Sequence, residues 1–229
     1  MISSEATNPW TRTFYPRDGD GVGFDRVVFF SDAVFAIALT LMAVDIGIPE
    51  IEDPSSPSQL WSAIGQKGTL IAGFAVAFFW VAIYWRANHR FTNALSGMSA
   101  RYIAVIVVYL GLVALLPFPA GMLGEYWQNP IAIIVFSAYA AMISTMEVVL
   151  FVVADRDGMF IAPISRKFRQ LSILGSLTPV AAFVVAIPVA FVSTLAAIAA
   201  YVVVAGVLGM IVNKVFDTKE LMKDPSSNR

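Results

Sequence analysis

Residues 27–48 read VVFFSDAVFAIALTLMAVDIGI, a run whose only polar residues are Ser31, Asp32, Thr40 and Asp45. A helix needs about 20 mainly apolar residues to cross the hydrocarbon core of a bilayer. This run has that length and composition. It therefore predicts a membrane-spanning helix, and later parts of the chain repeat the pattern.

Five further apolar runs lie at residues 68–88, 102–123, 131–154, 171–190 and 194–213. Together with the first run, they predict an all-α integral membrane protein with six transmembrane helices in a domain of residues 26–216. Residues 1–25 and 217–229 flank this domain. The segment 1–25 has no apolar core, so we do not expect a cleavable signal peptide, and the first span is expected to direct its own insertion.

Composition excludes several classes of function. Of the 229 residues, 58% are hydrophobic and 14% are charged, against about 25% charged in a soluble domain. The net charge of −1 leaves no basic excess for nucleic acid. With no cysteine and one histidine, a thiolate or His-rich metal site is not expected. No Walker loop or Gly-x-Ser-x-Gly elbow is present, so we predict neither an enzyme nor a bound cofactor.

Charge placement predicts the orientation of the spans. Every Lys and Arg except Lys67 falls in the amino-terminal segment, the loops after spans two and four, or the carboxy-terminal tail. Cytoplasmic flanks retain such positive charge. Acidic residues mark the opposite face: Glu50, Glu52, Asp53 and Glu125. We therefore predict a multi-pass protein of the cell (plasma) membrane with both termini in the cytoplasm.

Three ionisable residues lie inside the predicted spans: Asp32, Asp45 and Glu147. Such groups are costly in a membrane and are functional candidates by default. The alternative is that each carboxylate forms a hydrogen bond within the bundle and fixes helix packing. His89, at the inner end of span two, is level with Ser31 and Asp32; its ordinary role is a hydrogen-bonding one, although its titration range also suits a pH sensor.

A helical wheel separates two faces of the first span. Ile37, Thr40, Leu41 and Val44 share one stripe of roughly 100°, and Asp32 lies about 140° from Ile37. Asp32 thus faces away from the stripe, which favours a structural bond to a neighbouring helix. Periodicity by itself favours core packing over pore lining for the stripe.

The segment Arg26-Val27-Val28-Phe29-Phe30-Ser31-Asp32, continued by Ala36-Ile37 and Thr40, resembles the transmembrane protein 175 family of endosomal and lysosomal potassium channels, in its bacterial branch. The Trp80–Phe91 segment and Leu116-Pro117-Phe118-Pro119, followed by Glu125-Tyr126, are similar to the family's second and third spans. The resemblance covers about residues 24–127. Asn88 departs from it, because relatives often carry a second histidine there.

This resemblance implies a homotetramer of six-helix subunits in the lipid bilayer. The first helices would line a central potassium-permeable pore that has no re-entrant selectivity filter. By matching positions, Ile37, Leu41 and Val44 would form the pore constriction. Thr40 would contribute to selectivity, with the permeating K⁺ ion near it and no other metal or cofactor.

The same matching gives four residues a structural role. Arg26, Ser31, Asp32 and His89 would form a polar network that ties the first span to its neighbours. This agrees with the wheel for Asp32, and it replaces core packing by pore lining for the Ile37 stripe. Two alternatives stay open: a proton- or cation-coupled secondary transporter that uses Asp32 and Glu147, and a non-conducting membrane scaffold.

Overall fold

The structure, a computed structural model, describes residues 14–18 and 22–215. The predicted tail 217–229 and most of the predicted segment 1–25 lie outside these residues. The elements, in chain order, are β1 (Phe14–Pro16), α1 (Val22–Val44), α2 (Pro57–Gln66), α3 (Gly68–Asn93), β2 (Gly97–Ser99), α4 (Ala100–Leu115), α5 (Pro117–Glu125), α6 (Pro130–Arg156), α7 (Arg166–Ala190) and α8 (Thr194–Val215).

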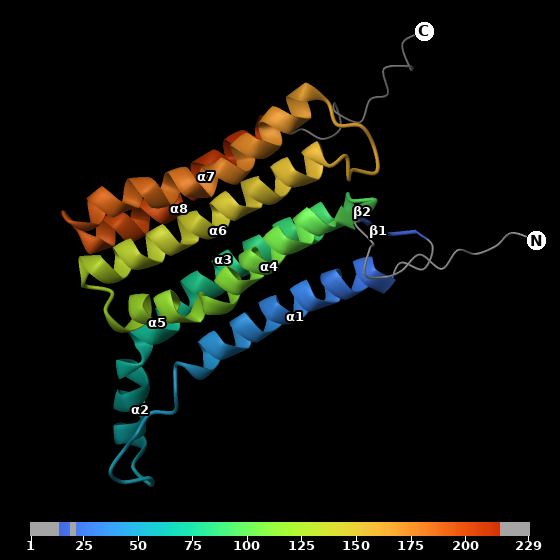
Figure 1. The fold of residues 1–229 in the computed structure, drawn as a ribbon. Helices are drawn as coiled ribbons and strands as arrows, with labels where there is room; N and C mark the ends of the chain where they lie inside the picture. Colours follow the sequence, from blue (N-terminus) through green and yellow to red (C-terminus); the bar gives the residue numbers. More distant parts are fainter. Residues whose placement is uncertain (1–13, 19–21, 216–229) are drawn as a thin grey trace, which may run out of the picture.

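The long helices lie side by side as one bundle, with α1 at one edge and α7 and α8 at the opposite edge (Figure 1). Five stretches among the described residues are long and apolar enough to cross a membrane: Val22–Val44, Gly68–Asn93, Ala100–Glu125, Pro130–Arg156 and Ser172–Ala190. They coincide with the first five predicted spans. The 22-residue helix α8 occupies the place of the sixth, so the all-α membrane fold is confirmed.

The first helix begins and ends earlier than the predicted span 27–48. It starts at Val22 and stops at Val44, and the chain then turns at Asp45 and Ile46. Gly47 has φ of 64°, a left-handed conformation that glycine adopts without steric cost. Apolar composition alone did not reveal this end, because the residues after the turn are still largely apolar.

The third span is divided into α4 and α5. Pro117 lacks a backbone N–H and cannot donate a hydrogen bond within the helix, so α4 ends at Leu115 and α5 begins at Pro117. The short helix α5 then packs against α3. A Cβ atom on Gly73 would lie 2.6 Å from the Gly124 Cα, so these two glycines let the backbones of α3 and α5 approach closely.

One end of the bundle carries a small β structure that the all-α prediction missed. β1 pairs antiparallel with β2, with Phe14 opposite Ser99 and Pro16 opposite Gly97. A further bridge joins Leu95 to Phe160. These pairings hold the segment before α1 against the α3–α4 loop and that loop against the segment after α6.

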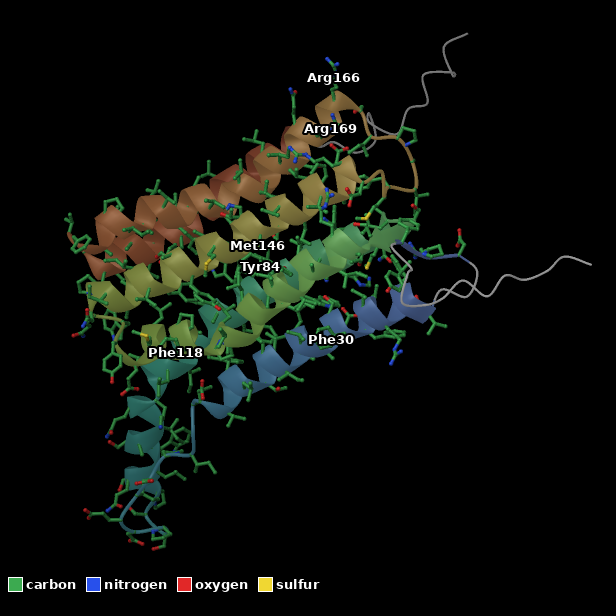
Figure 2. The ribbon with its side chains drawn as sticks, viewed as in Figure 1. Phe30, Tyr84, Phe118, Met146, Arg166 and Arg169 are labelled. Carbon is green, nitrogen blue, oxygen red and sulfur yellow. The ribbon has the colours of Figure 1, made fainter. Side chains whose placement is uncertain are left out.

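The basic residues gather at this same end. Arg26 lies in the first part of α1, Arg90 in the last turn of α3 and Arg156 in the last turn of α6. Arg166 and Arg169 lie at the start of α7, at the far end from α5 (Figure 2). Lys67 lies at the opposite end, between α2 and α3. This is the end that the sequence predicts to be cytoplasmic.

Candidate ion pathway

The helix α1 has two unlike faces. Its buried residues are Phe24, Ser31, Phe35, Ala38 and Met42, which recur at helical spacing and face α3, α4 and α5. The opposite face has no partner in the described part of this chain. A spanning helix that is buried on one side only must meet lipid or another copy on the other.

The four residues predicted to line a pore all lie on the uncovered face. Ile37 is 57% exposed and Val44 is 72% exposed, and Leu41 and Thr40 are exposed between them. The Thr40 hydroxyl donates to the Ile37 carbonyl oxygen at 2.9 Å. Because its proton is used within the helix, the hydroxyl oxygen is left as an acceptor. The chain therefore offers an apolar stripe interrupted by one hydroxyl oxygen.

The exposed stripe on α1 extends further along the helix than the sequence predicts. Phe30 lies seven residues before Ile37, on the same side of the helix, and its side chain is 54% exposed. Figure 2 shows Phe30 on α1, away from the middle of the bundle where Tyr84 and Met146 lie. Extending the seven-residue spacing backward from Ile37 would have found it. Phe30 continues the stripe toward the basic end.

Two polar residues of α1, Ser31 and Asp32, form hydrogen bonds to side chains of α3. The Asn88 amide donates to the Ser31 hydroxyl at 2.8 Å, and both side chains are buried. The indole N–H of Trp85 donates to Asp32 Oδ1 at 2.9 Å. His89 stacks on Trp85, with ring centroids 5.5 Å apart. These contacts fix the rotation of α1 about its own axis.

The structure thus brings together three of the four residues predicted to form a polar network. Ser31 and Asp32 each form a hydrogen bond to a different side chain of α3. His89 stacks on the Trp85 ring, which in turn donates to Asp32. Arg26 is exposed on α1, and the contacts found among the described residues do not join it to this group. Sequence reasoning missed Trp85 as a partner and treated Asn88 only as a departure.

The two other intramembrane candidates lie apart from the stripe. Glu147 on α6 accepts a hydrogen bond from the Tyr109 hydroxyl of α4 at 3.2 Å. Asp45 follows the end of α1 and lines a small cavity beside Met42 and Gly121. Among residues 14–18 and 22–215, no cluster of three or more His, Asp or Glu side chains is suited to hold a metal ion.

Comparison with known proteins shows what the first half of the chain is similar to. Residues 26–117, which include α3, α4 and most of α1, match the family model described as endosomal/lysosomal potassium channel TMEM175. Over this region the chain is similar to that family. The match includes the Ile37 stripe and the Ser31 and Asp32 contacts to α3. It does not reach α6, α7 or α8.

Two curated proteins that are similar to this chain are named potassium channels. One, from Streptomyces collinus, is 34% identical over 104 residues, which cover 45% of this chain and 49% of that protein. The other, from Chamaesiphon minutus, is 28% identical over 124 residues, which cover 54% of this chain and 61% of that protein. The aligned regions therefore span about half to three-fifths of these relatives. Both bear the name of a channel and not of an enzyme.

A solved structure extends the likeness to the whole bundle. It is the crystal structure of a lysosomal potassium-selective channel, a TMEM175 homologue from Chamaesiphon minutus. The TM-score is 0.70, with 22% identity, and the match covers 84% of this chain and 99% of that chain. At this identity the likeness establishes the fold.

Proposed function

We propose that this protein is a potassium-permeable cation channel, and not an enzyme, in which α1 lines the pore of a homotetramer. The observation that carries the proposal is the division of α1 into two faces. Its polar residues Ser31 and Asp32 are bonded to α3, whereas the Ile37 stripe is uncovered. The matched family and the names of the relatives support the same function.

Four copies of the stripe around one axis would form a constriction. Ile37, Leu41 and Val44 would make successive narrow apolar rings, and such a ring gives an ion nothing in exchange for its water shell. A closed ring therefore blocks current by excluding water. Opening requires the four helices to move apart at Ile37.

Thr40 is the one group of the stripe that can replace water around an ion. Its hydroxyl proton is directed to the Ile37 carbonyl oxygen, so four Thr40 oxygens would face the axis as acceptors. They would coordinate a partly dehydrated K⁺ ion. No bound cofactor is needed beyond the permeating ion itself.

The polar network has a structural role in this proposal. The bonds from Asn88 to Ser31 and from Trp85 to Asp32 hold α1 in the rotation that directs Ile37 to the axis. Stacking on Trp85 gives His89 a supporting place in the same group. Arg26, in line with the stripe and one turn before Phe30, would lie at the inner mouth.

The remaining features concern placement in the cell. We infer that residues 26–216 form the channel domain in the plasma membrane and that both termini are cytoplasmic. A reporter active only in the cytoplasm should work when fused near Gly158, in the loop after α6. A reporter that works instead in the loop before α2 would show that the orientation is the opposite of the one inferred here.

The transporter alternative has less support. It needs Asp32 and Glu147 to face a common ion path, but Asp32 is bonded to α3 and Glu147 to Tyr109 of α4.

Purified protein in a planar bilayer, with potassium on one side and sodium on the other, separates the alternatives. We expect unitary currents that reverse toward the potassium potential. Saturable coupled flux without unitary currents would indicate a transporter, and no flux a scaffold.

A further inference from the structure

The helix α2 differs from every other helix in its placement. Figure 1 shows it projecting away from the end of the bundle opposite to β1 and β2, past α1 and away from α7 and α8. None of its ten side chains is buried, and its apolar residues Leu60, Trp61 and Ile64 are exposed. Trp61 is 73% exposed.

The helix α2 is nevertheless a well-defined element. Ser56 is its N-cap and accepts a hydrogen bond from the Gln59 amide, and Pro57 occupies the first helical position. The Gln59 side chain in turn accepts from the Asp53 amide at 3.0 Å, which ties the preceding loop to the helix. An exposed apolar face on such a helix is a candidate surface for contact with another protein chain or with the membrane.

Length shows how far α2 reaches. Ten residues at 1.5 Å per residue give a helix of about 15 Å. Packed helices lie about 8–10 Å apart. In an assembly in which copies of α1 meet along the Ile37 stripe, a 15 Å helix that extends past its own α1 is long enough to reach a neighbouring copy.

We propose that α2 docks on a second copy of this chain at the outer end of the pore, with Leu60, Trp61 and Ile64 as its apolar contacts. The inference rests on the proposed assembly around α1 and deepens it by naming a further contact between subunits. It assigns a role to a segment that lies inside the matched region but outside the pore stripe.

Charge at the outer end fits this arrangement. The loop that leads to the tip of α2 carries Glu50, Glu52 and Asp53. Hydrogen bonds from the Ser55 hydroxyl and then from its amide lower the pKa of the Asp53 carboxyl, so this tip remains anionic at neutral pH.

The complementary cation in the proposed arrangement is Lys67 of the neighbouring copy. Lys67 Nζ is 3.7 Å from the position of a Cβ atom on Gly47, which places the amine at the outer end of α1. The ion pairs found among the described residues, Arg101 with Asp157 and Arg169 with Asp155, lie at the other end of the bundle. An acidic tip from one copy and Lys67 of the next are therefore available to each other.

The competing occupant of this apolar face is the outer leaflet of the membrane. Short amphipathic helices do lie in the headgroup region. However, α2 projects past α1 and away from α7 and α8 (Figure 1), toward the edge of the bundle where α1 has no partner among the described residues, and in the proposed assembly that edge faces protein. The two occupants give different covalent products when a photoreactive group is placed on α2.

The test uses the full chain in membranes with p-benzoylphenylalanine in place of Trp61. We expect irradiation to give covalent dimers and larger adducts. The matched control carries the same group at Gln66, which is exposed on the opposite side of α2, and we expect several-fold fewer adducts there. Lipid adducts or unlinked monomer alone at position 61 would overturn the docking.

A second variant separates this inference from the proposed function. The chain has no cysteine, so Val44→Cys introduces a single thiol on the stripe, and disulfide-linked dimers report that copies of α1 meet. Potassium currents are measured on the chain without this change. If the currents and the disulfide-linked dimers are present but position 61 gives no adducts between copies, the docking is wrong and the proposed function stands. Adducts at position 61 support the docking whether or not currents are seen.

Discussion

The helices α1 and α6 are both long and apolar, but they relate to the rest of the chain differently. α6 buries ten of its 27 residues and α1 five of its 23. On α6, the hydroxyls of Ser137 and Ser144 contact Tyr201 and Tyr84, and Glu147 accepts from Tyr109. The polar groups of α6 are thus satisfied within one chain.

On α1 only one face has partners within the chain. Ser31 and Asp32 form hydrogen bonds to α3, but no other described element covers the Ile37 stripe. An apolar face in lipid gains nothing by association with another helix unless packing or polar contacts favour it. A helix that anchors its polar side and leaves a hydroxyl-bearing stripe open is better suited to line a pathway than to complete a core.

The largest expected effect tests the packed interior. Gly73→Ala places a methyl group 2.6 Å from the Gly124 Cα, so α3 and α5 must separate, and we expect most of the folded protein to be lost. Fluorescence-detected size-exclusion chromatography measures this. Gly111→Ala is the matched control, because a Cβ there meets nothing within 4 Å. Equal behaviour of the two variants would show that the close approach is not needed.

The next effect tests the open face. Ile37→Asn puts an amide on the proposed constriction, so the ring should hydrate more readily and the flux should rise several-fold. Liposome flux and single-channel amplitude report it. Val108→Asn on α4 is the control, because Val108 is also 57% exposed but lies off the stripe. Unchanged flux in correctly assembled Ile37→Asn protein would return the stripe to a packing role.

A smaller effect tests the anchored face. Asp32→Ala leaves the Trp85 indole N–H without its acceptor, and an intramolecular hydrogen bond contributes about 0.5–1.5 kcal/mol to stability. We expect a lower melting temperature and a lower tetramer yield, with the ion preference little changed. Normal assembly together with a lost cation preference would instead assign Asp32 to the ion path.

The smallest effect concerns selectivity. Thr40→Ala removes the outward-facing oxygen without narrowing the pore, so the potassium preference over sodium should fall while current persists. The reversal potential under bi-ionic conditions measures the change. Thr145→Ala on α6 is matched, since that exposed hydroxyl also donates to its own helix, to Ala141. A shift of equal size in both variants would contradict a role specific to Thr40.

Features that depend on local composition were predictable from the sequence. Hydropathy located the spans, and the helical wheel placed Asp32 and Ile37 on different faces. The sequence analysis did not predict α2, because ten residues are too few to span a membrane and its apolar residues are spaced to cover only one face of a helix.

Features that depend on pairing between distant segments were not predictable. The β1–β2 pairing joins residues about 80 positions apart through backbone groups, which carry no signature in composition. The Trp85 and Asn88 bonds to α1 depend on the relative rotation of two helices. The contact of Gly73 with Gly124 depends on how α5 folds back after Pro117.

The β1–β2 pairing has a consequence for the order of synthesis. β1 precedes α1, but its partner strand follows α3, so it cannot form until two spans have left the ribosome. The Ser99 hydroxyl also donates to Asp157, at 2.6 Å, and the Ser96 amide donates to the Met159 carbonyl oxygen. The strand pairing can therefore form before α6 has been made, whereas the contacts of the α3–α4 loop with Asp157 and Met159 form only afterwards. Until β2 has emerged, the segment before α1 lacks its strand partner.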